Sequence, residues 1–64
     1  MPLVQISFIE GPTAEQQREL ITDVTKAVID DFGVPAEAVQ VVLTSVPTSS
    51  WAVGGTPLSE LHAS

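Results

Sequence analysis

The chain lacks cysteine and tyrosine and has a single histidine, His62, among its 64 residues. Without cysteine it can form neither disulfides nor thiolate metal sites, and one histidine near the C-terminus excludes a histidine-rich metal site. We therefore expect neither a metal nor a cofactor. A domain of this size buries too little surface to be more than marginally stable alone. Small chains without disulfides or structural metals usually rely on oligomerisation, so the sequence predicts an oligomer.

Basic residues are also scarce: Arg18 and Lys26 stand against eight acidic residues, for a formal net charge of −6. No basic stripe exists that would bind nucleic acid, and an anionic membrane surface is disfavoured for the same reason. No apolar run approaches the ~20 residues of a membrane span. The start of the chain, Met1 to Val4, lacks the basic residues of a secretory signal. We expect a cytoplasmic protein with no nucleic-acid or membrane partner.

Two segments have the composition of β-strands. Residues 3–9 alternate apolar and polar side chains at a period of two, which is typical of a strand. Leu3 and Ile9 make the second face partly apolar as well, which favours a strand covered on both sides. Residues 38–46 are rich in valine and predict a second strand.

A helix is predicted between these strands, over residues 13–32. Thr13 and Gln16 match a capping box, in which each side chain satisfies a backbone N–H of the other residue. Gly33 suits the position just after a helix, and Pro35 prevents its continuation. Apolar residues recur at helical spacing and form one stripe: Leu20, Ile21, Val24, Ala27, Val28 and Phe32.

The C-terminal part predicts short elements. A polar turn at Thr48–Ser50 precedes residues 51–55, which have the composition of a short hairpin segment. Thr56 and Pro57 are typical of a helix N-cap and first helical residue. They predict one helical turn over residues 57–62.

Together these elements predict a single α+β domain over residues 1–64, in which a βαβ unit carries two parallel strands with a right-handed crossover. One helix covers only one face of such a sheet. Because 44% of the residues are hydrophobic, part of the apolar surface is expected to face other subunits. A second copy would supply the missing cover and give a four-stranded sheet with two helices.

The order of several short motifs resembles the 4-oxalocrotonate tautomerase family over nearly the whole chain. Met1-Pro2 leads directly into a strand, Ile9-Glu10-Gly11 precedes the capped helix, and Val34-Pro35 precedes the second strand. An aromatic residue, Trp51, is followed by Gly54-Gly55 near the end. The resemblance implies dimers of βαβ units, three of which form a hexamer, with the C-terminal hairpin reaching onto a neighbouring subunit.

The resemblance also implies a chemistry. In the family the initiator methionine is removed, and the amine of the following proline, here Pro2, acts as the general base. The pKa of a free α-amino group is about 7.7–8.0. An apolar pocket lowers this pKa, and a base with a pKa near neutral pH moves protons efficiently. The implied function is a tautomerase that converts enol and keto forms of a small carbonyl compound. The same amine could also attack a carbonyl and form an iminium.

The chain departs from the family at two positions that hold substrate carboxylates. Pro12 stands where members carry an arginine after the Glu-Gly of the first turn, and Gln40 stands where they carry a second one. The family's aromatic position is filled by Trp51, which would wall the pocket. We therefore name Gln40, Trp51 and Pro12 as candidate substrate-binding residues and predict a neutral or monoanionic substrate.

Other interpretations of the same residues remain open. Pro2 can be an edge-strand residue without catalytic role, and Trp51 an interface residue. Gln40 can be an outward-facing strand residue, and Pro12 simply the residue that leads into the helix. The chain can accordingly be a non-catalytic subunit that pairs with an arginine-bearing paralogue, or an inactive scaffold that retains the fold.

Overall fold

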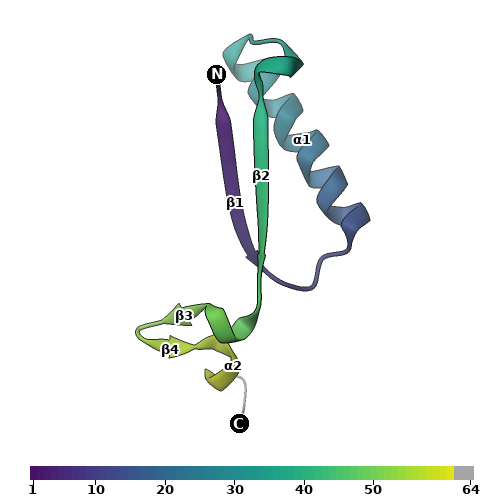
Figure 1. Ribbon diagram of the computed structural model, residues 1–64. Helices are drawn as coiled ribbons and strands as arrows, with labels where there is room; N and C mark the ends of the chain where they lie inside the picture. The colour runs from purple at the N-terminus through teal and green to yellow at the C-terminus, as the bar shows by residue number, and fades with distance from the viewer. Residues whose placement is uncertain (62–64) are drawn as a thin grey trace.

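The structure, a computed structural model, describes residues 1–61 (Figure 1). The elements follow in the order β1 (Leu3–Ile9), α1 (Ala14–Phe32), the 3-10 turn η1 (Ala36–Ala38), β2 (Gln40–Val46), the 3-10 turn η2 (Thr48–Ser50), β3 (Ala52–Val53), β4 (Thr56–Pro57) and α2 (Leu58–Leu61). Within residues 1–61, no helix combines the length and apolarity needed to cross a membrane.

The central unit is a parallel pair of strands with α1 along one face (Figure 1). β1 and β2 pair in register from Leu3 opposite Gln40 to Ile9 opposite Val46. The crossover from β1 to β2 passes through α1, which confirms the predicted βαβ architecture and α+β class. The strand prediction for residues 3–9 is confirmed without change.

Both ends of α1 are fixed by the predicted caps. The Gln16 N–H donates to Thr13 Oγ1 at 3.1 Å, and the Thr13 N–H donates to Gln16 Oε1 at 2.8 Å. At the other end Gly33 has φ 67°, and its N–H donates to the Ile29 carbonyl at 2.9 Å. The N-cap contributes roughly 1 kcal/mol, and the Gly33 N–H satisfies one of the last carbonyls of the helix. Local sequence signals therefore mark both ends of this helix.

The second strand begins two residues later than predicted, at Gln40 instead of Ala38. Residues 36–38 form η1, in which the Ala38 N–H donates to the Pro35 carbonyl at 3.0 Å. In the observed register, Ala38 would have to pair with Met1, which lies before the start of β1. The valine-rich segment therefore becomes a strand only where β1 offers a partner.

The prediction that Thr56 and Pro57 open a helix is wrong. Both lie in β4, where Thr56 pairs with Val53 and Pro57 with Ala52 in an antiparallel hairpin. Gly54 (φ 61°) and Gly55 (φ 88°) adopt the left-handed conformations of the tight turn, which glycine tolerates best. The helical turn follows as α2, and the predicted final residue His62 lies outside the described residues.

The covered face of the sheet is only half-buried, and the other face is open. Val4, Ile6 and Phe8 lie on the α1 side and are partly covered. On the opposite face, Leu3 and Val42 are 52% and 46% exposed. Among residues 1–61, no side chain is fully buried. In the predicted helical stripe Val24 and Val28 are half-buried, whereas four members remain exposed: Leu20, Ile21, Ala27 and Phe32.

The dimensions of the protomer agree with this missing cover. Its radius of gyration is 15.2 Å, whereas a compact chain of this length has about 11 Å. Its accessible area is 4735 Å², whereas a compact monomer of this mass exposes about 3,900 Å². The protomer is therefore too extended and too exposed to be a self-sufficient folding unit.

We predict that the protein has no stable folded monomer at micromolar concentration, because its open sheet face must be covered by another copy. Sedimentation velocity combined with far-UV circular dichroism over a dilution series measures this. Loss of helical signal should accompany dissociation. A species of 6.7 kDa that retains its circular dichroism spectrum would contradict the prediction.

Candidate active site

Pro2 lies immediately before β1 and is held against the start of β2. The Gln40 N–H donates to the Pro2 carbonyl at 3.0 Å. This bond extends the parallel ladder by one step, since Gln40 pairs in register with Leu3. Pro2 is half-buried, whereas Met1 before it is 94% exposed. The position of Pro2 is thus defined by the sheet, while the residue that precedes it is open to solvent.

Gln40 is adjacent to Pro2 through the backbone, but its side chain belongs to the open face. Its register partner Leu3 and the next residue on that face, Val42, are both exposed, and side chains alternate between the faces of a strand. The same alternation places Pro2 on the α1 side, with Val4. Within residues 1–61 the Gln40 carboxamide makes no hydrogen bond, so its donor and acceptor remain free.

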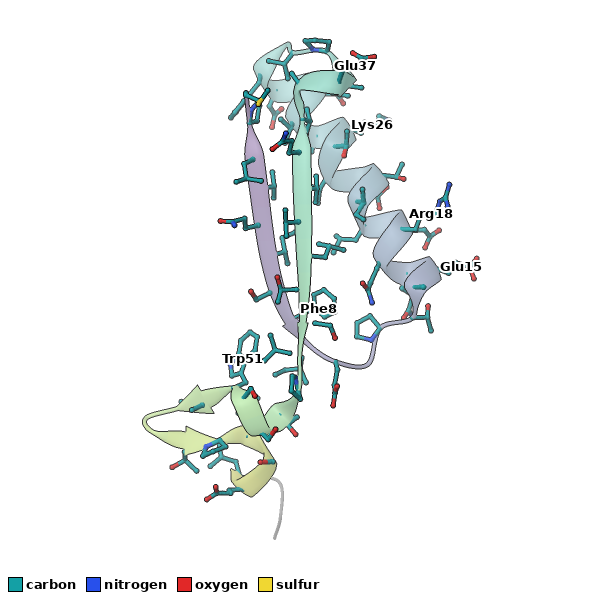
Figure 2. The ribbon with its side chains drawn as sticks, viewed as in Figure 1. Phe8, Glu15, Arg18, Lys26, Glu37 and Trp51 are labelled. Atoms are coloured by element: carbon teal, nitrogen blue, oxygen red, sulfur yellow. The ribbon has the colours of Figure 1, made fainter. Side chains whose placement is uncertain are left out.

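Pro12 and Trp51 lie at the other end of the sheet. Pro12 follows the end of β1, and Trp51 follows β2 and η2 (Figures 1 and 2). The seven residues of β1 separate the two ends by roughly 20 Å at the usual rise per residue. A single protomer therefore brings only the Gln40 backbone to Pro2, and brings neither Pro12 nor Trp51 there. The assignment of these residues to one substrate site stays a prediction.

Trp51 is half-buried and forms part of a small C-terminal unit that projects from the sheet (Figure 2). Its carbonyl accepts a hydrogen bond from the Leu58 N–H at 2.7 Å. The hairpin β3–β4 and α2 make their main contacts with each other and with η2, and not with β1 or β2. This unit therefore makes little contact with the sheet of its own protomer.

The end of the molecule that carries Pro2 also gathers acidic residues. α1 runs opposite to the strands, so its C-terminal turn lies at the Pro2 end (Figure 1). That turn contains Asp30 and Asp31 and no basic residue, and Glu37 follows in η1. The carbonyl end of a helix adds partial negative charge. Lys26, about one turn earlier, is exposed and forms no ion pair within the described residues.

No local motif in the sequence assigns a role to these acidic residues, although the topology predicts where they lie. In any βαβ unit the helix returns the chain to the end where the strands begin. A predicted helix that finishes in Asp30-Asp31 therefore places both carboxylates at the end where Pro2 begins the first strand. Topology, and not a local motif, carries that information.

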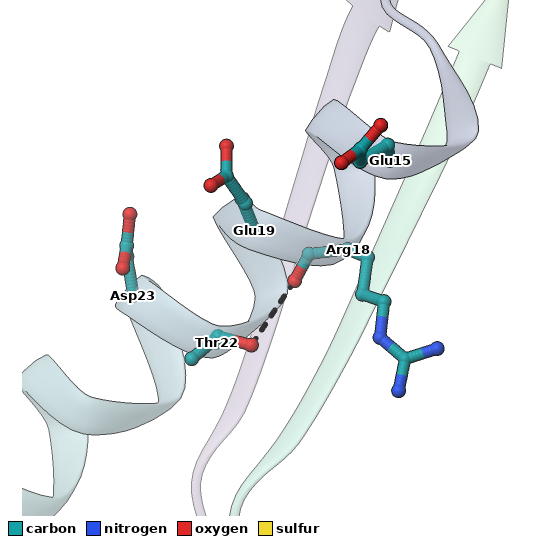
Figure 3. A pocket seen from close by; sticks show the side chains of 5 residues that line it. All are labelled: Glu15, Arg18, Glu19, Thr22 and Asp23. Atoms are coloured by element: carbon teal, nitrogen blue, oxygen red, sulfur yellow. Dashed lines mark hydrogen bonds between the residues drawn. The ribbon is translucent and has the colours of Figure 1, made fainter.

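A second group of charged residues lies on the exposed face of α1. Five side chains line a shallow depression of about 330 Å³ there (Figure 3): Glu15, Arg18, Glu19, Thr22 and Asp23. The Thr22 hydroxyl donates to the Arg18 carbonyl at 3.2 Å, which is a bond within the helix. Because all five side chains come from one helix and none is a candidate site residue, the depression is a solvated charged face.

The fold is a βαβ unit followed by a short C-terminal hairpin, and comparisons with known proteins identify its family. A sequence model described as "Tautomerase enzyme" matches residues 2–61. The chain belongs to the tautomerase family, within its 4-oxalocrotonate tautomerase group.

Three relatives illustrate the similarity. A 2-hydroxymuconate tautomerase of Pseudomonas sp. (strain CF600) is 38% identical over 62 residues, which cover 97% of this chain and 98% of the relative. The crystal structure of TomN, a 4-oxalocrotonate tautomerase homologue in the tomaymycin biosynthetic pathway, is 33% identical with a TM-score of 0.91, covering 98% and 97% of the two chains. A heterohexamer 4-oxalocrotonate tautomerase from Chloroflexus aurantiacus is 35% identical with a TM-score of 0.86, covering 97% and 100%.

Proposed function

We propose that this protein is a tautomerase that moves a proton between the enol and keto forms of a small carbonyl compound, with the Pro2 amine as general base. Family membership supports an isomerase-type activity. The observation that carries the finer proposal is the placement of Pro2. It lies at the start of the sheet, where its carbonyl accepts a hydrogen bond from the Gln40 N–H at 3.0 Å, and the preceding Met1 is exposed.

The proposed reaction needs Met1 to be removed. With Met1 attached, the Pro2 nitrogen is part of an amide and has no basic lone pair. After removal, the secondary amine takes the proton from the enol hydroxyl and becomes an ammonium. The resulting enolate is then protonated at carbon by that ammonium, which regenerates the free amine and leaves the keto product. The base and the acid are thus the same nitrogen in successive steps.

The site is proposed to form between protomers. Pro12 and Trp51 lie roughly 20 Å from Pro2 in one chain, so they can meet a substrate at Pro2 only if they come from a neighbour. Gln40 also presents its carboxamide on the opposite sheet face from Pro2, which favours a contribution from another copy. A homohexamer accommodates both requirements, and the heterohexameric relative supports six-subunit assembly.

We predict that protein lacking Met1 ketonises phenylenolpyruvate and that protein retaining Met1 does not, because only the former has a basic nitrogen at Pro2. Intact mass and initial rates should be measured on the same preparations. A Pro2→Ala variant without Met1 is the matched control, since it replaces the secondary amine of the proline ring with a primary amine. Equal rates with and without Met1 would rule out amine catalysis.

A second candidate function is that of one subunit type in a mixed oligomer. The positions that carry arginine in the family are Pro12 and Gln40 in this chain, and a structural relative at 35% identity is a heterohexamer. In such an assembly the arginines would come from the other subunit type.

We expect the chain to assemble and to be active without a second type of subunit. Purification of the protein from its native cells distinguishes this homo-oligomer from a mixed oligomer. A C-terminal affinity tag leaves Pro2 free, and intact mass identifies every chain in the purified assembly. Stoichiometric recovery of a tautomerase chain with arginines at both positions, together with an inactive recombinant homo-oligomer, would establish the mixed form. A homo-oligomer that is inactive without any partner would indicate a scaffold.

A further inference from the structure

Within residues 1–61, the side chains assigned to the proposed site carry no positive charge. Gln40, which is held beside Pro2 by a 3.0 Å hydrogen bond, ends in an uncharged carboxamide. Pro12 and Trp51, at the other end of the sheet, are uncharged as well. Any site assembled by joining these two ends from different protomers therefore contains neutral donors and an aromatic wall, and no guanidinium or ammonium from these positions.

The charges that lie nearest to these two ends are mostly negative. Asp30, Asp31 and Glu37 lie at the Pro2 end, together with the carbonyl terminus of α1. Glu10 directly follows β1 at the other end. A cleft lined by charge of one sign repels ligands of the same sign and lowers their rate of association.

Arg18 and Lys26 both lie on α1, a helix that carries more acidic than basic side chains. Arg18 shares its depression with Glu15, Glu19 and Asp23 (Figure 3). Lys26 lies on the same helix, one turn before Asp30 and Asp31. If a neighbouring copy brought this face of α1 to the site, it would bring more carboxylates than cations.

We propose that the Pro2 site selects uncharged enols, aldehydes and ketones and disfavours substrates that carry carboxylates. This inference rests on the proposed function and specifies its substrate class. In the reaction, the only negative charge that the site must stabilise is the transient enolate oxygen formed when Pro2 takes the enol proton. The carboxamide of Gln40 from a neighbouring copy has a free N–H pair for that oxygen. The ammonium of Pro2 balances the charge until it returns the proton to carbon.

A matched series of one enol tests this selection. The probes are 2-hydroxymuconate as the dianion, its monomethyl ester and its uncharged dimethyl ester, each rate being divided by the rate of the uncatalysed reaction of the same compound. We expect kcat/KM of the Met1-free protein to rise with each carboxylate removed, by about tenfold or more in total at low salt, and the difference to shrink as salt screens the charges.

Variants that remove acidic side chains distinguish electrostatic repulsion of the substrate from a difference in how well the ester groups fit the site. Asp31→Asn combined with Glu37→Gln should raise kcat/KM for the dianion and leave the dimethyl ester unchanged. Asp23→Asn, a mid-helix carboxylate, is the matched control and should alter neither. Gln40→Arg with Pro12→Arg should raise turnover of the dianion selectively. Gln40→Arg alone serves if the loop at Pro12 does not tolerate the change.

The outcomes distinguish this inference from the proposed function. Activity that depends on a free Pro2 amine but is highest for the dianion overturns the inference alone, and Arg18 of a neighbouring copy would then be the residue to replace. No Pro2-dependent activity on any of the three probes overturns the proposed function, and the inference with it.

Discussion

The structure depends on covering a two-stranded parallel sheet that has a helix on only one face. α1 shields the side that carries Val4, Ile6 and Phe8, but even these side chains remain partly accessible. Leu3 and Val42 on the other face have no cover within the described chain. Hydrophobic burial is the dominant favourable term in folding, and a single protomer realises only part of it. Association thus completes the core instead of joining finished domains.

The same constraint governs the site. Pro2 is located by the first hydrogen bond of the β1–β2 ladder, whereas Pro12 and Trp51 are located by the opposite end of that ladder. A strand is stiff, so its length keeps the two groups apart. The C-terminal hairpin contacts η2 and α2 and not the sheet, and the proposed shared site requires it to extend to a neighbouring protomer. Folding, assembly and the proposed catalysis are therefore linked through one sheet.

Much of the fold could be predicted because its signals are local. The capping box at Thr13 and the left-handed Gly33 define α1 within the helix sequence itself, and the alternation of residues 3–9 defines β1. The two incorrect predictions, the start of β2 and the helix at Thr56-Pro57, arose where strand pairing overrides the local preference of the residues. Ala38 has no partner on β1, and the Gly54-Gly55 turn draws Thr56-Pro57 into a ladder. The candidate site was harder to predict, because Pro2 lies at the opposite end of the sheet from Pro12 and Trp51 within one protomer. Their grouping rests on family resemblance.

Mixing two variants tests most directly whether the site is shared between protomers. Pro2→Ala keeps Trp51, and Trp51→Ala keeps Pro2. Each should be impaired alone, and the two should be unfolded together, reassembled and assayed beside unmixed samples treated in the same way. If Pro2 of one protomer works with Trp51 of another, the mixed oligomers contain some fully intact sites, and their activity exceeds the average of the two variants. Activity equal to that average would contradict a shared site.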